Sequence, residues 1–179
     1  MRLQRGPAAD EIDILIEAEG WHRLLPGAER VAERAAAAAF AAGLPATAGE
    51  RDSLTAILLS DDAALRALNR QFRGLDKPTN VLSFPAAADA GPADRPLSWG
   101  DVAIALETTA REAGEQGKSL ADHLSHLVVH GLLHLFGYDH EAADEAEAME
   151  AMEREILEGL GIGDPYAAVP AAAAETTGR

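Results

Sequence analysis

Residues 119–140 read SLADHLSHLVVHGLLHLFGYDH, and the run of apolar residues within them predicts one long, packed helix. Ser119 is a favoured N-cap residue, and Gly137 can adopt a positive φ that ends the helix after Phe136. A helix that is apolar over most of its surface must be covered by other elements. We therefore expect the helix over residues 119–136 to occupy a central place in the fold.

The same stretch holds most of the histidines in the chain. There are six in total, and five lie between positions 123 and 140, namely His123, His126, His130, His134 and His140. At about 100° per residue, the first four fall within an arc of roughly 80° on the helix surface. The histidines therefore share one face of the predicted helix.

Three of these histidines have the spacing of metal ligands. His130 and His134 stand one helical turn apart, and Gly137 lets the chain reverse and return His140 toward them. Three histidine nitrogens suit zinc, and a fourth position left open for water is typical of a catalytic site. We predict one zinc ion per chain at this site, with Asp139 as a candidate acceptor that orients one imidazole.

The histidines also allow other interpretations. His123 and His126 fit ordinary, hydrogen-bonded helix histidines better than ligands. The spacing of the three candidate ligands also matches the metzincin peptidases, but those enzymes need a glutamate as general base where this chain has Gly131. A peptidase is therefore disfavoured.

Composition narrows the possible functions. The chain has 179 residues, a formal net charge of −15 and no cysteine, which excludes disulfides, thiolate metal sites and thiol nucleophiles. With this acidity, nucleic acid or an anionic membrane can be bound only through a local basic patch. The N-terminus has no signal-peptide pattern, and the alanine-rich run 35–44 is too short to span a membrane, so we expect a soluble, cytoplasmic protein without a membrane partner.

The remaining sequence predicts an α+β fold, with α/β as the alternative. Period-2 or short apolar runs predict four strands, at 12–16, 54–59, 81–84 and 102–106. Helical patterns predict five helices, at 27–42, 61–73, 107–116, 119–136 and 141–160. We expect one domain over residues 1–170, with a small mixed sheet packed by helices, and a disordered tail over 171–179.

The last predicted helix has an apolar stripe and an acidic face. Met149, Met152 and Ile156 form the stripe that we expect to be buried. The acidic side chains are expected to form a solvated surface. They are Glu141, Asp144, Glu145, Glu147, Glu150, Glu153, Glu155 and Glu158.

A second informative stretch is the predicted helix over 61–73. Leu65, Leu68 and Phe72 share one face, which we assign to the core, and the arginines fall on the other. Arg66 is assigned to an ordinary solvated surface. Arg70, Arg73 and, in the following turn, Lys77 are candidate RNA contacts, with Arg73 best placed to hold a phosphate.

Residues 68–85 (LNRQFRGLDKPTNVLSFP) and 130–140 (HGLLHLFGYDH) together resemble the YbeY family of single-strand-specific metallo-endoribonucleases, also called ribosomal RNA maturation factors. Gly100-Asp101 and Asp164-Pro165-Tyr166 also look like this family, so the resemblance spans roughly 12–166. It implies zinc held by His130, His134 and His140, a functional Arg73, and maturation of the 3′ end of small-subunit ribosomal RNA with a part in ribosome quality control. The implied partners are single-stranded ribosomal RNA, the ribosome or its small subunit, and ribosomal or GTPase assembly proteins.

The resulting hypothesis is hydrolysis of an RNA phosphodiester. Zinc, with His130 among its ligands, would supply hydroxide or polarise the phosphate, and Arg73 would neutralise the charge that builds on phosphorus. The general acid is unassigned, with Asp139 or a second water as candidates. The alternatives are a ribosome-assembly binding module with structural zinc, and a metal-dependent hydrolase of another substrate.

Overall fold

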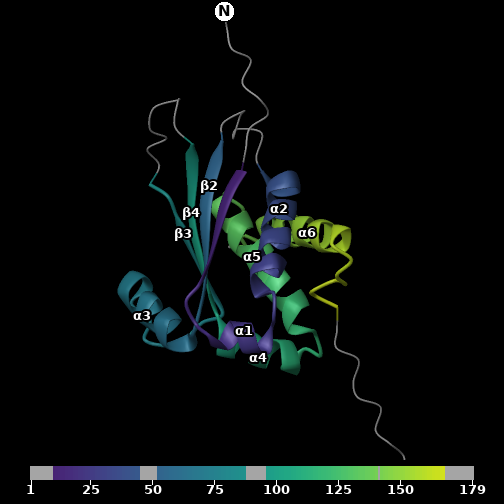
Figure 1. Cartoon of the computed structure of the whole chain (residues 1–179). Coiled ribbons are helices and arrows are strands. Elements are labelled where there is room, and N and C mark those ends of the chain that lie inside the picture. The colour runs from purple at the N-terminus through teal and green to yellow at the C-terminus, as the bar shows by residue number, and fades with distance from the viewer. Residues whose placement is uncertain (1–9, 45–51, 88–95, 141, 168–179) are drawn as a thin grey trace, which may run out of the picture.

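The four strands form one mixed sheet in the order β1-β2-β4-β3 (Figure 1). The computed structural model describes residues 10–44, 52–87, 96–140 and 142–167. The strands are β1 (Asp10–Ile16), β2 (Ser53–Ser60), β3 (Val81–Pro85) and β4 (Leu97–Ala105). β1, β2 and β4 are parallel and β3 is antiparallel to β4, which confirms the predicted α+β domain on a small mixed sheet.

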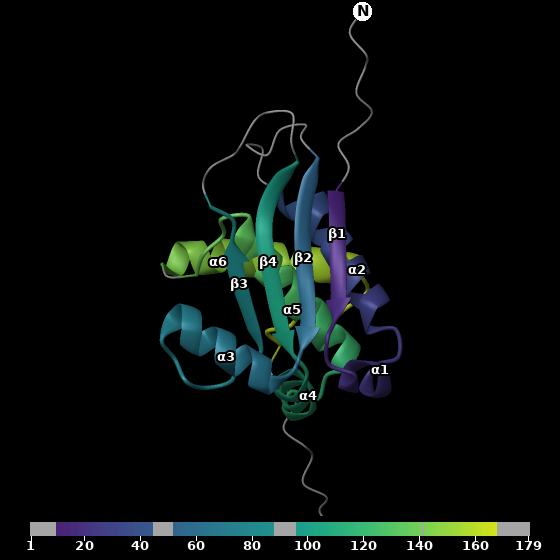
Figure 2. The same cartoon turned by 60° about the vertical axis from the view of Figure 1, so that its left-hand side comes forward.

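Helices cover the two faces of the sheet unequally (Figure 2). The helices are α1 (Gly20–Leu24), α2 (Ala28–Gly43), α3 (Asp62–Arg73), α4 (Leu106–Glu115), α5 (Leu120–Leu135) and α6 (Ala143–Gly159). In Figure 2, α2, α5 and α6 lie behind the sheet and α3 lies in front of its lower end. The sheet therefore has one fully packed face and one partly open face.

Helix α5 is the centre of the packed face, as the sequence predicts. Its Leu124, Val128 and Leu132 are fully buried in one cluster with the sheet residues Ile57 and Val102. The side chain of Ser119 accepts a hydrogen bond from the backbone N–H of Asp122 at the start of the helix. The histidines of α5 lie beside this buried cluster, and His130 and His134 line a cavity together with the β3 residues Val81 and Ser83.

Three expectations need correction. The five-residue helix α1 was not predicted, because one turn is too short to show a helical period; it is anchored by the buried Trp21. The strand β4 begins at Leu97, before the strand predicted at 102–106, because Gly100 with φ of 113° interrupts the strand pattern where a Cβ would overlap the Phe84 carbonyl. Phe72, assigned to the core, is 60% exposed.

The exposure of Phe72 follows from the position of α3. The helix buries Leu65 against Leu82 of β3, but its C-terminal end extends past that edge strand (Figure 2). There Phe72 packs edge-to-face with Phe84, with the ring centroids 5.1 Å apart. The end of α3, which also carries Arg73, therefore projects beside the sheet.

Two further sequence predictions concern the ends and surface of the chain. The predicted tail 171–179 lies outside the described residues, as does Glu141. Over the ranges that the structure describes, no helix combines the length and the apolar character needed to cross a membrane.

Candidate metal centre and its cavity

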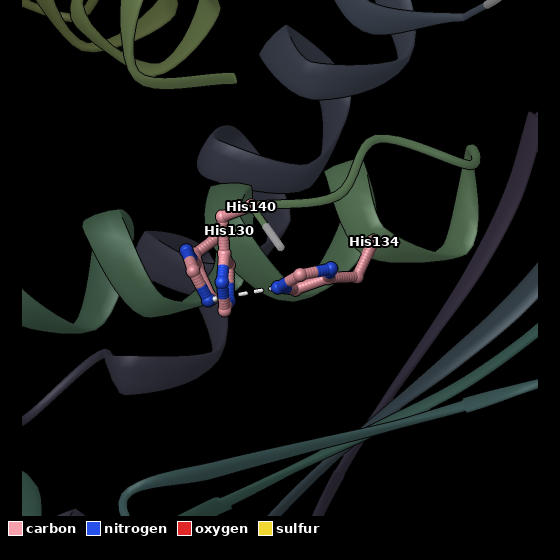
Figure 3. Close-up of side chains that lie close together, drawn as sticks. All are labelled: His130, His134 and His140. Carbon is pink, nitrogen blue, oxygen red and sulfur yellow. Dashed lines mark hydrogen bonds between the residues drawn. The ribbon is translucent and has the colours of Figure 1, made fainter. Parts of the chain in front are cut away.

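Three histidine rings meet at the C-terminal end of α5 (Figure 3). His130 and His134 come from the helix itself, and their Nε2 atoms lie 3.2 Å apart. One ring nitrogen of each, and one of His140, all lie within 4.8 Å of one another. Ligands of a tetrahedral zinc site stand about 3.4 Å apart, given Zn–N bonds of about 2.05 Å. The donor atoms and their spacing therefore fit a single metal ion.

The turn after α5 brings His140 to the other two rings. Gly137 has φ of 95°, and the N–H of Tyr138 donates to the Leu133 carbonyl, which closes the helix and reverses the chain. Asp139 Oδ1 accepts from the backbone N–H of His140 at 2.7 Å. The structure therefore places Asp139 on the backbone of His140, whereas we expected it on an imidazole.

The surroundings of His134 favour a neutral ring. Its Nδ1 lies 3.1 Å from the carbonyl oxygen of Tyr138 and is the nitrogen that donates when the ring is neutral. Burial, followed by repulsion from His130 and His140, lowers the pKa of His134 below the usual histidine value. A neutral ring that donates from Nδ1 has a free lone pair on Nε2, which is the form that binds a metal.

His130 is oriented by a buried carboxylate that we expected on the surface. Its Nδ1 lies 2.7 Å from Oε1 of Glu153, a residue of α6 with no solvent exposure. Glu153 was grouped with the solvated acidic face, and that assignment is wrong. Helical spacing gave a signal that could have found it, because Glu153 lies four residues after Met149 and three before Ile156, within the buried stripe.

Besides His130, two further side chains contact the Glu153 carboxylate. The hydroxyl of Tyr166 donates to its Oε2, and Nε2 of His126 lies 3.5 Å from the same oxygen. Burial opposes ionisation of Glu153, but contacts from His126, His130 and Tyr166 outweigh it and lower the pKa of Glu153 to about 2. One ring nitrogen each of His126 and His130, with a Glu153 oxygen, forms a second group whose spacing could hold a metal ion.

A cavity of about 620 Å³ opens in front of the three histidines and holds Arg73. Arg73 reaches it from the end of α3, and residues of β3 and of the segment before it complete the wall. The lining residues are Arg73, Thr79, Asn80, Val81, Ser83, Pro85, His130, His134, Gly137, Tyr138, Asp139 and His140. The structure thus brings Arg73 to the histidines, although His130 lies 57 positions after Arg73 in the sequence.

The other predicted cations lie elsewhere. Arg70 and Lys77 do not line the cavity. Arg66 forms a bidentate pair with Asp76, at 2.7 and 3.0 Å, and more than half of each side chain is exposed. Arg66 is therefore a solvated surface residue, as predicted.

A second cavity, of about 500 Å³, adjoins the first and shares Asn80, Val81 and His130 with it. At its floor, Glu112 Oε2 accepts from Asn80 at 2.9 Å and lies 3.0 Å from Nε2 of the buried His123. His123 is therefore a hydrogen-bonded helix histidine, as predicted. The same prediction is wrong for His126: within the described part of the chain neither of its ring nitrogens has a hydrogen-bond partner, and its Nε2 only approaches Glu153 Oε2, at 3.5 Å.

The position that would carry the general base of a metzincin has no room for one. A Cβ on Gly131 would stand 2.7 Å from Cγ1 of Val102, and the Gly131 carbonyl accepts from the Ser83 hydroxyl at 3.0 Å. Helix α5 is thus in contact with the sheet at this residue. A glutamate could not be accommodated without separating the helix from the sheet, which agrees with the argument against a peptidase.

Sequence comparisons connect this site to known proteins. Residues 28–161 match the family model described as Endoribonuclease YbeY. The chain is 55% identical over 158 residues to the endoribonuclease YbeY of Nitrobacter winogradskyi, covering 87% of this chain and 81% of the relative. It is 56% identical over 135 residues to that of a Chelativorans species, covering 75% and 80%. A solution structure from Thermotoga maritima is 25% identical with a TM-score of 0.49, covering 88% of this chain and 99% of that one.

Proposed function

The chain belongs to the endoribonuclease YbeY family and is a hydrolase of RNA, and from this premise we propose that it cuts single-stranded ribosomal RNA at the histidine cavity. The observation that carries the proposal is the shared cavity, in which three candidate metal ligands face one arginine. Family membership favours an RNA substrate over the alternative of a metal-dependent hydrolase of another substrate. The other alternative, a ribosome-assembly binding module with structural zinc, is separated from this proposal by the cleavage test below.

His130, His134 and His140 would hold one zinc ion. Three neutral nitrogens fit zinc, and the open cavity in front of them leaves space for water and substrate. Bound there, the ion would supply Lewis acidity toward water and a phosphoryl oxygen. The protein contributes the fixed positions of the three rings.

Arg73 would bind the phosphate. It is the one permanent cation among the residues that line the histidine cavity, and no described carboxylate is paired with it as Asp76 is with Arg66. A guanidinium offers two parallel N–H donors to phosphate oxygens, and it stabilises the negative charge that increases as the phosphodiester is attacked. In a chain of net charge −15, this local cation gives RNA a defined point of contact.

The pair of adjoining cavities supports a single-stranded substrate. A flexible strand can turn one phosphate toward Arg73 and place a neighbouring nucleotide in the second cavity, past Asn80. A duplex holds its bases stacked and its phosphates on the outside of a stiff rod, so it cannot fill both cavities together.

The cellular role that we propose rests on the family resemblance. It is 3′-end maturation of small-subunit ribosomal RNA and ribosome quality control, carried out in the cytoplasm by one domain over residues 1–170. The strong negative charge predicts weak affinity for naked RNA. Contacts with the ribosome, its small subunit, or ribosomal and GTPase assembly proteins would supply the remaining affinity.

The test is cleavage of a single-stranded RNA that carries a small-subunit 3′ precursor. Wild type, His134→Ala and Arg73→Ala are compared, with metal content measured on each preparation. Arg66→Ala is the matched control, because it removes an arginine from the same helix outside the cavity. We expect full cleavage by wild type and the control, strongly reduced cleavage by Arg73→Ala and none by His134→Ala; equal cleavage by His134→Ala would overturn the assignment of the site.

A further inference from the structure

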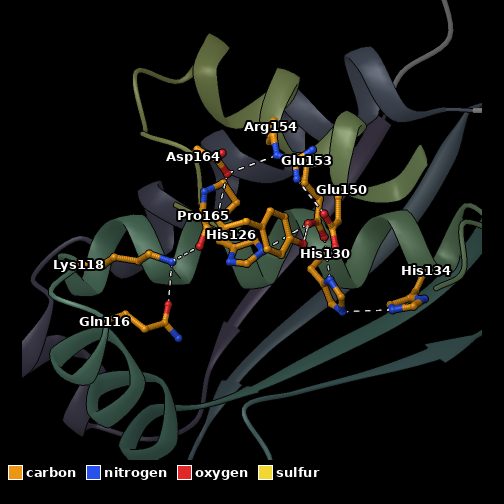
Figure 4. Close-up of polar contacts among 11 residues, drawn as sticks. Gln116, Lys118, His126, His130, His134, Glu150, Glu153, Arg154, Asp164 and Pro165 are labelled. Carbon is orange, nitrogen blue, oxygen red and sulfur yellow. Dashed lines mark hydrogen bonds and ion pairs between the residues drawn. The ribbon is translucent and has the colours of Figure 1, made fainter. Parts of the chain in front are cut away.

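A buried carboxylate beneath the metal centre has no part in the mechanism described so far. Glu153 projects from α6 toward α5 and has no solvent exposure, and His130 lies between it and His134 in Figure 4. Burying a charge is unfavourable unless partners replace the water. Both oxygens of Glu153 have such partners: Oε1 contacts Nδ1 of His130, and Oε2 accepts from Tyr166.

This contact determines the state of the His130 ring. An ionised carboxylate accepts hydrogen bonds only, so Nδ1 of His130 must carry the proton that joins them over 2.7 Å. In the neutral ring, Nε2 is then the free acceptor, and it is the atom that lies 3.2 Å from Nε2 of His134. Of the two α5 ligands, His130 is thus fixed by a charge, and His134 by the Tyr138 carbonyl.

Tyr166 is in turn held in place by residues around it. Arg154 Cζ lies 5.1 Å from the centre of the Tyr166 ring, and Arg154 Nε lies 3.4 Å from Asp164. Asp164 accepts from the backbone N–H of Tyr166 at 2.9 Å, and Lys118 donates to the Pro165 carbonyl at 2.5 Å (Figure 4). The segment after α6, part of which resembles the family without a known role, is therefore held against α6 and against the residues before α5.

We propose that Tyr166 and Glu153 act in series as positioning residues that hold His130 with Nε2 directed at the metal. The role rests on the proposed function, since it requires His130 to be a ligand. Carboxylate partners of this kind orient metal-binding histidines and raise their basicity, and their loss typically lowers metal affinity about 10-fold to 100-fold.

The same atoms allow a different prediction, a second ion between His126, His130 and Glu153. The contacts favour the hydrogen-bonded network. A ring nitrogen at 2.7 Å from a carboxylate oxygen is at hydrogen-bond distance, and Tyr166 already occupies the other oxygen. We therefore expect one metal ion per chain, with Nδ1 of His130 protonated.

The experiment uses the full chain and the variants Glu153→Gln and Tyr166→Phe, which preserve side-chain shape. Glu155→Gln is the matched control, because it removes the same charge from an exposed position of α6. Zinc affinity and stoichiometry are measured by competition with a chromogenic chelator. The tautomer of His130 in zinc-free protein is read from nitrogen NMR, a property that a general loss of stability would not shift. Thermal unfolding confirms that each variant is folded.

We expect wild type and Glu155→Gln to bind one equivalent of zinc and to show His130 protonated at Nδ1. Glu153→Gln should lose about 10-fold to 100-fold in zinc affinity and relax the tautomer preference, with a smaller loss for Tyr166→Phe. Unchanged zinc affinity in Glu153→Gln, or Nδ1 unprotonated in wild type, would overturn the role. So would two equivalents of zinc, one of them lost in Glu153→Gln. Wild type that binds no zinc would instead overturn the proposed function itself, and the positioning role with it.

Discussion

Two histidines of α5 contact carboxylates from neighbouring helices, and they meet different surroundings on their other side. His123 Nε2 lies 3.0 Å from Glu112 of α4, and its Nδ1 is buried without a hydrogen-bond partner in the described residues. His130 Nδ1 lies 2.7 Å from Glu153 of α6, and its Nε2 faces His134 across the cavity. The same kind of histidine–carboxylate pair therefore joins α5 to a neighbouring helix at both positions, but only at His130 does the second ring nitrogen face the other candidate ligands.

The two carboxylates also differ in their exposure to solvent. The Glu112 side chain is 26% exposed, whereas that of Glu153 is fully buried and also accepts from Tyr166. Water can therefore replace a lost partner at Glu112 but not at Glu153. A histidine next to a carboxylate can therefore contribute to a metal site only where its second ring nitrogen lies close to other metal-binding atoms.

The largest effect is expected from His134→Ala, which removes the convergence that distinguishes His130 from His123. Two histidines remain, and zinc binding and RNA cleavage should fall together to the level of a blank. Metal content and cleavage measured on one preparation check this. His123→Ala removes an α5 histidine that is not one of the three candidate ligands, and the folded variant should retain its metal. Loss of zinc in both variants would contradict the distinction between His130 as a candidate ligand and His123 as a structural histidine.

Arg73→Ala should act on the substrate side alone. Removing one preorganised donor to the transition state lowers turnover by about 100-fold to 1,000-fold, and the histidines are untouched. Cleavage rates on a short single-stranded RNA, together with zinc content, give the result. Normal cleavage by a zinc-loaded Arg73→Ala protein would remove Arg73 from the mechanism.

Gly131→Ala tests the close contact that sets the distance of α5 from the sheet. The new Cβ would lie 2.7 Å from Val102 Cγ1, so the helix or the strand must shift, and we expect a loss of about 1–3 kcal/mol in unfolding free energy. Urea unfolding measures it. Gly159→Ala is the control, because no atom outside its own helix lies within 4 Å of the new Cβ; equal losses would contradict the packing argument.

The sequence predicted that His130 and His134 share a site, but it did not predict the contact between His130 and Glu153, and both outcomes have physical reasons. The candidate ligands His130 and His134 are recognisable because both lie on one helix, where spacing alone determines which face they share. The contact of His130 with Glu153 joins two helices, and a charged residue in an apolar stripe can be assigned as buried only when its partner is known. The prediction that Phe72 is buried was wrong for a similar reason. A helical period shows which residues share a face, but it does not show how far the sheet beneath that face extends.

A smaller effect is expected from Glu112→Gln, the counterpart of Glu153→Gln at the other pair. The amide can still accept a hydrogen bond, and water reaches the site, so stability should fall by about 0.5–1.5 kcal/mol. Zinc affinity should remain that of wild type, because Glu112 contacts none of the three candidate ligands. A loss of zinc affinity equal to that of Glu153→Gln would show that the His123–Glu112 pair supports metal binding as much as the His130–Glu153 pair does.

The smallest effect is the pH dependence of the pair at His123. Burial lowers the pKa of His123 below 6.5, Glu112 opposes this in part, and His126 and Lys118 add to it. Below pH 6.5 the unfolded chain therefore binds a proton that folded His123 resists, so stability declines as the pH falls through this window. Urea unfolding of zinc-free wild type and His123→Gln at about pH 7.5 and about pH 5.5 isolates the contribution. The variant should lose less stability than wild type between the two conditions. Equal losses would mean that the contact with Glu112 fully offsets the effect of burial on the pKa of His123. The His123–Glu112 pair would then resemble the ionic contact at Glu153.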